Sequence, residues 1–248
     1  MRLIKAMGSQ DTILATVETQ GFCFIDHNVL DLDIKKLRHW FADYFGPHAN
    51  ESKYKDVAVF AMDELSENRL VKDLLKKIVT LTDLTSANGF YLDKIWLVHS
   101  LPRDEPSDSL PYVPHFDKHR YVKVMIYLDD VSLSDGPFHS LSFAPIKNEE
   151  KRLNLSKNYK YNGENTVKDI SVDDFIPCVG CSGSIVIFDT NCPHFAGSIN
   201  GEGHRRVLRF DFDNRMFHSR ARNVFSRIRS ILGQSIQHDK RIRKNIHQ

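Results

Sequence analysis

The segment Tyr121-Val-Lys-Val-Met-Ile-Tyr-Leu128 consists almost entirely of β-branched, aromatic and other large apolar residues. This composition is typical of a strand that is buried in a sheet. Three further segments share it, at residues 94–101, 183–188 and 206–212. Because these strands follow one another without helical patterns between them, the sequence predicts an antiparallel sandwich or barrel.

The first third of the chain has a different pattern, in which helices surround one short strand. Residues 21–25, Gly-Phe-Cys-Phe-Ile, predict the strand. Large apolar residues then recur at helical spacing over residues 33–44, and a second helix is predicted from about residue 64 to residue 81. The fold class predicted from the whole chain is therefore mostly β with flanking helices.

The composition is that of a globular protein with one substantial core. The chain has 248 residues, of which 41% are hydrophobic and 27% are charged. No run of about 18 apolar residues is present, so we expect no transmembrane segment. Polar residues interrupt the first 20 positions, which argues against a signal peptide, and the four cysteines are too few for a disulfide scaffold. We therefore expect a cytoplasmic protein.

Charge is distributed unevenly along the chain. Residues 215–248 contain nine Lys and Arg and one acid, a net charge of +8, which leaves −6 on the rest of a chain whose net charge is +2. From Arg222 onward, apolar residues recur at helical spacing opposite the arginines. We expect a domain at residues 1–214 and a basic amphipathic helical tail at 215–248. Docking of the tail on its own domain or on a second subunit is favoured over contact with nucleic acid or an acidic membrane. The oligomeric state stays open.

Residues 147–169 are polar and irregular. A connection of this length in a compact domain is often a lid or a binding loop. A solvated surface loop is an equally good interpretation.

The residues with the clearest chemical potential are His115, Asp117 and His194. In an extended segment, His115 and Asp117 project from the same face because they are two residues apart. His194 follows the 183–188 strand and could complete a set of two histidines and one carboxylate. Such a set favours ferrous iron, because three protein ligands on one side leave three coordination positions open.

Other interpretations of these residues remain. A His-x-Asp pair is expected about once by chance in a chain of this composition. A metal-free surface motif, a buried tethering histidine at 194 and an exposed salt bridge at Arg205 are the ordinary alternatives. Cys178, Cys181, Cys192 and His194 also have the spacing of a structural zinc set, although that set would leave His115 and Asp117 without a third ligand.

The order of these motifs resembles the phytanoyl-CoA dioxygenase-like branch of the iron(II)- and 2-oxoglutarate-dependent oxygenases. The resemblance spans roughly residues 20 to 214 and is strongest in the following segments: His115-Phe-Asp117, Leu128-Asp-Asp130-Val131, Asp135-Gly-Pro137, Gly183-Ser-Ile-Val-Ile-Phe188, His194 and Arg205. It implies a double-stranded β-helix, also called a jelly roll, with helices packed on one sheet.

The resemblance also implies roles for individual residues. His115, Asp117 and His194 would hold Fe(II). Arg205 would pair with the distal carboxylate of the cosubstrate 2-oxoglutarate, assisted by Asn200 or Ser198. Arg206 is the alternative to Arg205, because alternation along a strand allows only one of two adjacent arginines to face the pocket.

The activity that the resemblance implies is O2-dependent hydroxylation of an aliphatic carbon in a small or carrier-bound molecule. The carboxylate at Asp117 argues against halogenation. The segment Phe138-His-Ser-Leu141 departs from the family's Pro-Gly-Ser-His run, so the substrate side of the pocket is not implied, and His139 is interpreted as structural. Two alternatives are a non-catalytic jelly-roll binding module with a basic tail and a cupin-like oxygenase that does not use 2-oxoglutarate.

Overall fold

Two facing β-sheets form the centre of the molecule in this computed structural model, which describes residues 11–48, 50–51, 55–60, 68–102, 110–153 and 165–214. The larger sheet has seven strands, in the order β1 (Phe22–Ile25), β8 (Ile185–Asp189), β5 (Tyr121–Tyr127), β10 (Arg205–Asn214), β4 (Phe90–Ser100), β3 (Lys55–Phe60) and β2 (Asn50–Glu51). The smaller sheet has the order β7 (Ile176–Cys178), β6 (Phe138–Ser140) and β9 (His194–Ala196). The predicted mostly β fold with flanking helices is confirmed.

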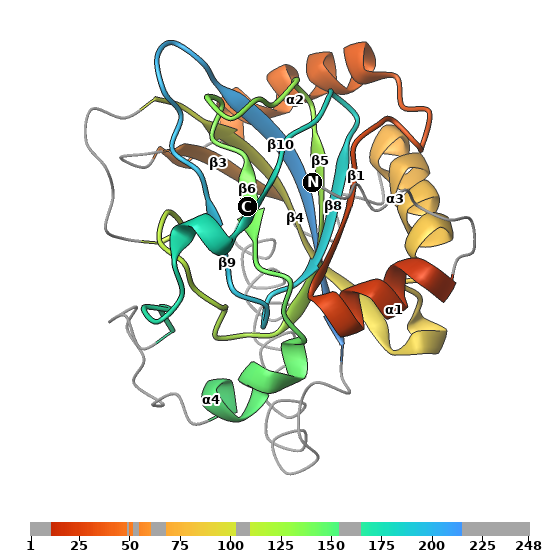
Figure 1. The fold of residues 1–248 in the computed structure, drawn as a ribbon. Coiled ribbons are helices and arrows are strands. Elements are labelled where there is room, and N and C mark those ends of the chain that lie inside the picture. Colours follow the sequence, from red (N-terminus) through yellow and green to blue (C-terminus); the bar gives the residue numbers. More distant parts are fainter. Residues whose placement is uncertain are drawn as a thin grey trace, which may run out of the picture. The chain divides into compact units, whose positions relative to one another are not determined.

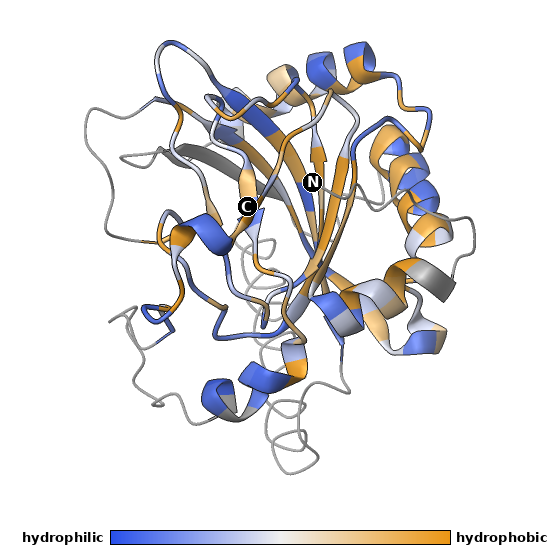
Figure 2. Cartoon of the chain, in the orientation of Figure 1, coloured by the Kyte–Doolittle hydropathy of each residue, from blue (hydrophilic) through white to orange (hydrophobic). Residues whose placement is uncertain are grey.

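Three helices lie on the side of the large sheet that faces away from the small sheet: α1 (Asp11–Gln20), α2 (Ile34–His48) and α3 (Arg69–Thr82) (Figure 1). The helices predicted near residues 33–44 and 64–81 are confirmed. Asn68 caps α3 by accepting a hydrogen bond from Val71 N, so the helix begins at residue 69 rather than near 64. Hydrophobic residues gather in the central strands (Figure 2).

Helix α1 was not predicted from the sequence. It buries Ile13 and Val17 and ends at Gln20, and the N–H of the following Gly21 donates to Val17 O. Gly21 has a φ of +85°, and a Cβ there would lie 2.3 Å from Cys192 Sγ. Glycine is therefore required where the helix turns into β1.

Alternate residues of the central strands face opposite sides of the large sheet, one side packed in the apolar core and the other lining a cavity. In β10, Leu208, Phe210 and Phe212 are almost completely buried on one face. The alternate residues Arg205, Val207, Arg209 and Asp211 line a cavity on the other face. The large sheet therefore forms one wall of this cavity.

Tyr127 joins the two sheets. Its hydroxyl donates to Cys178 O at 2.9 Å in β7 and accepts from Phe138 N at 3.1 Å in β6. The side chain is fully buried among apolar residues of both sheets. A single phenol thus satisfies two buried backbone groups of the small sheet.

The polar segment at residues 147–169 is only partly irregular, which corrects the prediction. A 3₁₀ turn at Pro145–Asn148 leads into the short helix α4 (Glu149–Leu153). Glu149 accepts hydrogen bonds from Arg152, Asn191 and Arg120, which hold the start of α4 against the body of the fold. Two further 3₁₀ turns occur at Ser86–Asn88 and Val172–Asp174.

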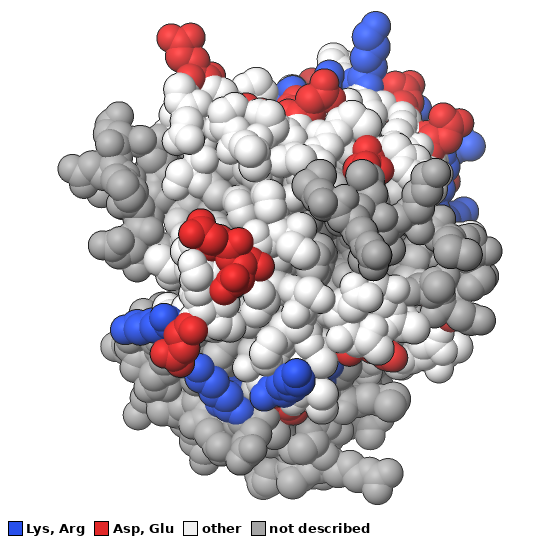
Figure 3. All heavy atoms as spheres, in the orientation of Figure 1, with Lys and Arg blue, Asp and Glu red and all other residues white. Residues whose placement is uncertain are grey.

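The predicted tail helix at 215–248 lies outside the described residues, so the structure says nothing about it. Among the residues that the structure does describe, no helix is long and apolar enough to cross a membrane. On the face shown in Figure 3, basic side chains are interspersed with acidic ones.

Candidate metal centre

Backbone pairing brings the three predicted ligands together. His115 and Asp117 precede β5, and His194 is the first residue of β9. His115 N donates to His194 O at 3.0 Å and His194 N donates to His115 O at 2.8 Å, so the two histidines form an antiparallel bridge. Asp117 N donates to Thr190 O at 2.8 Å, which extends the pairing by one more contact.

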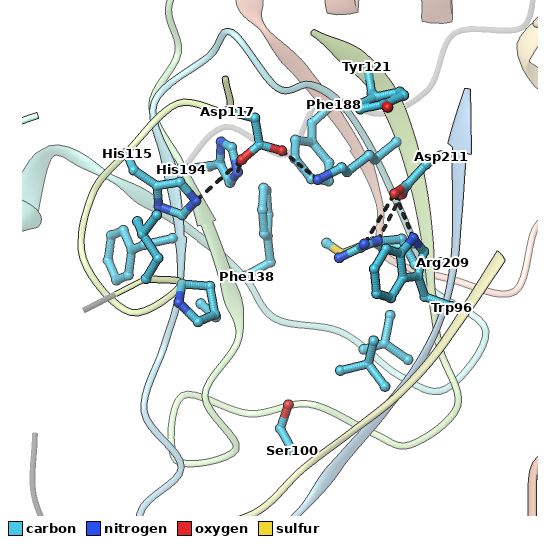
Figure 4. A pocket seen from close by; sticks show the side chains of 18 of the residues that line it. Trp96, Ser100, His115, Asp117, Tyr121, Phe138, Phe188, His194, Arg209 and Asp211 are labelled. Atoms are coloured by element: carbon cyan, nitrogen blue, oxygen red, sulfur yellow. Dashed lines mark hydrogen bonds and ion pairs between the residues drawn. The ribbon is translucent and has the colours of Figure 1, made fainter. Parts of the chain in front are cut away.

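The ligand atoms of this triad converge on one point. Asp117 Oδ1 lies 3.6 Å from His115 Nε2 and 3.8 Å from His194 Nε2 (Figure 4). One ligand atom from each of the three residues lies within 4.8 Å of the others. A single cation could therefore bind all three, and two histidines with one carboxylate form the donor set that leaves positions open on non-haem iron.

Hydrogen bonds orient both imidazole rings for this role. Nδ1 of His115 lies 2.7 Å from Val113 O, and Nδ1 of His194 lies 2.7 Å from Cys192 O. A carbonyl oxygen only accepts, so Nδ1 carries the proton in each ring and the lone pair is on Nε2. Burial, together with the charge of the neighbouring His115, lowers the pKa of His194 to about 3, which keeps this ring neutral.

Lys123 pairs with only one of the two oxygens of the Asp117 carboxylate. Its Nζ lies 2.6 Å from Asp117 Oδ2, whereas Oδ1 faces the histidines. Burial alone would raise the pKa of Asp117, but the charges of Lys123, His194 and His115 and the hydrogen bond from Lys123 outweigh burial and hold the pKa well below its usual range. The carboxylate is therefore ionised, with one oxygen available to a cation.

The triad lies at the wall of a cavity of about 400 Å³. The large sheet contributes alternate residues of three neighbouring strands, β5, β10 and β4. The opposite wall includes Phe138 of β6 and Phe195 and Ala196 of β9. The cavity is thus enclosed between the two sheets.

Arg205 lines the same cavity. Its side chain is buried, and among the described residues its one hydrogen bond is from Nη2 to Ser100 Oγ at 3.4 Å. Nε and Nη1 are buried without a partner among the described residues. Burial lowers the pKa of this guanidinium. A buried, unpaired cation beside a cavity is costly and would be stabilised by an anionic ligand.

Arg206 points away from this cavity. Its Nε donates to Asp129 Oδ2 at 2.9 Å and its Nη2 donates to Asp129 Oδ1, an ion pair outside the cavity lining. The alternation of β10 therefore places Arg205 in the cavity lining and Arg206 outside it.

The other predicted site residues are not brought to the cavity. Asn200 and Ser198 are exposed and do not line it, because the buried Ile199 takes the inward position between them. His139 does not line the cavity either. It donates Nδ1–H to Pro137 O and stacks on Phe195 of the cavity wall, which fits a structural role.

Comparison with known proteins shows a relationship in structure only. No protein-family model and no curated protein matches the sequence. The epimerase SnoN, solved with Fe3+, alpha ketoglutarate and nogalamycin RO, has a TM-score of 0.60 at 13% identity, over 83% of each chain. EvdO2 from Micromonospora carbonacea var. aurantiaca, complexed with 2-oxoglutarate, has a TM-score of 0.55 at 14% identity, over 86% of this chain and 93% of EvdO2. HygX from Streptomyces hygroscopicus, with nickel and 2-oxoglutarate bound, has a TM-score of 0.57 at 13% identity, over 82% and 86% of the two chains.

The chain is a double-stranded β-helix. In this jelly roll the triad and Arg205 line one cavity. The alternative zinc set is not assembled: among the described residues, the histidine–aspartate triad is the group placed to hold a metal, and all four cysteines are free thiols.

Sequence reasoning missed several residues of the jelly-roll cavity, namely Lys123, Trp96, Arg209 and Asp211. For Arg209 and Asp211, the even spacing from Arg205 along a predicted strand could have indicated that they face the cavity. Arg209 and Asp211 are four and six residues after Arg205, so they lie on the same face of β10. Lys123 pairs in register with Asp211 on the neighbouring strand.

Proposed function

We propose that this protein is an iron(II)- and 2-oxoglutarate-dependent dioxygenase of the phytanoyl-CoA dioxygenase-like type. The observation that carries the proposal is the buried guanidinium of Arg205, unpaired at two nitrogens, in the same cavity as the His115, Asp117 and His194 triad. The triad offers a cation two neutral imidazoles and one carboxylate oxygen. Arg205 offers a carboxylate two parallel hydrogen bonds. 2-Oxoglutarate can use both, because it binds a metal at one end and carries a second carboxylate at the other.

Different residues of this chain would bind the metal, bind the cosubstrate and exclude water. His115, Asp117 and His194 would hold Fe(II), with Nε2 of each ring and Oδ1 of the carboxylate as donors. Arg205 and Ser100 would bind the distal carboxylate of 2-oxoglutarate. Iron and 2-oxoglutarate would supply the oxidising chemistry, in which O2 is consumed while 2-oxoglutarate is decarboxylated to succinate. The apolar wall at Phe138 and Phe188 would limit the access of water to the metal.

The substrate would be small, or only the end of a larger one would enter. The cavity of about 400 Å³ must hold 2-oxoglutarate as well as the reacting part of the substrate. We propose hydroxylation of an aliphatic carbon. The structurally similar SnoN was solved with nogalamycin RO besides alpha ketoglutarate, which supports an organic small molecule as the class of substrate.

Arg205 and the triad each argue against one alternative. A cupin-like oxygenase without 2-oxoglutarate would have no use for a buried guanidinium in the metal cavity. A binding module without a metal would have no use for two neutral imidazoles whose Nε2 atoms converge with one carboxylate oxygen.

The test is anaerobic reconstitution of the purified protein with Fe(II) and 2-oxoglutarate. We expect one iron and one 2-oxoglutarate per chain, with succinate released on admission of oxygen. Asp117→Ala should lose iron binding, whereas Asp43→Ala, an exposed acid on α2, should retain it. Equal iron binding by the wild type and Asp117→Ala, or no uptake of 2-oxoglutarate, would contradict the proposal. A screen of metabolites for stimulated succinate release would then search for the substrate.

A further inference from the structure

A second charged cluster lies across the cavity from the triad. It consists of Trp96 on β4 and Arg209 and Asp211 on β10, and we term it the Arg209 cluster (Figure 4). The figure shows these three side chains on one side of the cavity and His115, Asp117 and His194 on the other. Arg205 and Ser100 belong to a third part of the same lining.

Arg209 is held on one edge and on one face. Its Nε donates to Asp211 Oδ1 at 2.8 Å and its Nη2 donates to Asp211 Oδ2 at 3.2 Å. Its guanidinium lies 4.4 Å from the centroid of the Trp96 ring, and Trp96 Nε1 donates to Asp211 Oδ2 at 2.7 Å. Each member of the cluster thus restrains the other two.

These contacts leave one edge of the guanidinium for a ligand. Nη1 makes no hydrogen bond with any described residue, and Nη2 uses only one of its two N–H groups on Asp211. The edge formed by Nη1 and Nη2 is the one that binds a carboxylate or phosphate end-on. Because Asp211 and Trp96 already fix the ring, little side-chain entropy is lost on binding.

The charge of the cavity also favours an anion. The cations that line it are Lys94, Lys118, Lys123, Arg205 and Arg209, and the anions are Asp117 and Asp211. Among the described residues, Lys94, Lys123 and Arg209 each have an acidic partner, at Asp93, Asp117 and Asp211. The described lining nevertheless holds more cations than acids, which favours an anionic ligand over a cationic one.

We propose that Arg209, oriented by Asp211 and Trp96, binds an anionic group of the substrate, either a carboxylate or a phosphate monoester. The substrate would then be a small anionic molecule that reaches from this wall to the triad opposite. The inference rests on the proposed function, because it assigns the 2-oxoglutarate site to Arg205 and the substrate site to Arg209. It makes Arg209 a specificity-determining residue.

The test compares anionic probes with neutral analogues of the same shape. Hexanoate and hexanamide, and benzoate and benzamide, are titrated calorimetrically into protein loaded with Ni(II) and saturating 2-oxoglutarate, so that Arg205 is occupied. Hexyl phosphate and phenyl phosphate form the phosphate arm. We expect at least one anion to bind about 10-fold or more tightly than its neutral analogue. The arm that shows the preference identifies the anionic group.

Two variants assign this preference to Arg209. Arg209→Gln should abolish the preference for the anion, and Arg209→Gln combined with Asp211→Asn should do the same without leaving a buried carboxylate unpaired. Arg206→Gln is the matched control, because it removes an arginine from the same strand that pairs with a carboxylate outside the cavity. The control should keep the preference, and all variants should keep their affinity for 2-oxoglutarate.

The outcomes separate this inference from the proposed function. Equal binding of anions and neutral analogues, no binding of any anion, or a preference that survives in the double variant would overturn the role of Arg209. Failure of the wild type to bind 2-oxoglutarate would instead overturn the proposed function.

Discussion

Lys123 donates to one oxygen of Asp117 at 2.6 Å, while the other oxygen of the same carboxylate faces both imidazoles of the triad. Lys123 comes from β5 and is buried, so the ammonium group has little freedom to leave. A carboxylate with one oxygen occupied in this way can give a cation only one donor. The triad would then take three coordination positions rather than four.

The first prediction tests this restraint. Lys123→Met removes the ammonium group and keeps the length of the side chain. Asp117 should then be free to bind with both oxygens and to compete with 2-oxoglutarate for a coordination position. We expect iron binding to persist and the affinity for 2-oxoglutarate to fall about 10-fold, a loss of about 1.4 kcal/mol. Anaerobic titration of the Fe(II) protein with 2-oxoglutarate measures this. Lys35→Met, an exposed lysine on α2, is the control, and unchanged affinity in Lys123→Met would show that the restraint is dispensable.

The second prediction concerns the two adjacent arginines of β10. Arg205→Gln should weaken 2-oxoglutarate binding by roughly 10- to 100-fold, because charged hydrogen bonds contribute about 1.5–3 kcal/mol. Arg206→Gln should leave this affinity unchanged and lower the free energy of unfolding instead, because its partner is Asp129. Calorimetric titration of both variants measures the affinity for 2-oxoglutarate, and urea unfolding measures the free energy of unfolding. Loss of 2-oxoglutarate binding in Arg206→Gln, with binding retained in Arg205→Gln, would assign the cosubstrate to Arg206 instead.

The third prediction concerns the contact between the two sheets. Tyr127→Phe keeps the ring but leaves Cys178 O and Phe138 N without their partner. Each buried unsatisfied group costs about 1–3 kcal/mol, so we expect the free energy of unfolding to fall by roughly 2–4 kcal/mol. Urea denaturation followed by circular dichroism measures this free energy of unfolding. A fall of less than about 0.5 kcal/mol would mean that the phenol does not hold the small sheet in place.

The fourth prediction concerns acid stability. Burial would raise the pKa of Asp129, but the hydrogen bonds and charge of Arg206 outweigh it, and the pKa is below its usual range. The unfolded state then binds more protons than the folded state at acid pH, so the stabilisation is complete above the ordinary aspartate pKa of about 4 and is lost as pH falls through the folded-state pKa. Asp129→Asn should be less stable at pH 7 and should lose less stability between pH 5 and pH 2 than the wild type. Parallel acid-unfolding curves for the two proteins would contradict this.

The fifth prediction concerns the basic tail. All residues assigned to the cavity precede residue 214. Deletion of residues 220–248 should therefore leave iron binding and substrate-independent 2-oxoglutarate turnover largely intact. Loss of all turnover in a truncated protein that still shows the wild-type circular dichroism spectrum would place part of the site in the tail.

Long periodic segments made most of the fold predictable. The strands containing Val98, Met125, Ile187 and Phe210 each carry enough apolar residues to show their character, and so do helices α2 and α3. Strands β6, β7 and β9 have only three residues each, which is too short for a period to appear. Their pairing depends on contacts from distant segments, such as those of Tyr127, that local composition does not encode.

Part of the candidate site could be predicted from the order of chemically suitable residues along the predicted strands. His115, Asp117 and His194 were named as a possible metal set, and Arg205 as a possible carboxylate-binding residue, from that order and their chemistry. The placement of Asn200 and Ser198 could not be predicted, because it depends on which residue of that segment is turned inward, and Ile199 takes that position. Arg209 and Lys123 have the composition of ordinary surface residues, and only the register of β5 and β10 shows that they face the cavity.

The antiparallel bridge between His115 and His194 has a consequence for the life of the protein in the cell. Both segments must be paired through their main chains before the two imidazoles face the same point, so a nascent or partly unfolded chain has no preassembled triad. Metal uptake would then follow folding rather than guide it, and a bound ion would stabilise the native state by an amount that rises with the logarithm of its free concentration. If the triad holds iron as proposed, depletion of iron would therefore lower the stability of the folded protein.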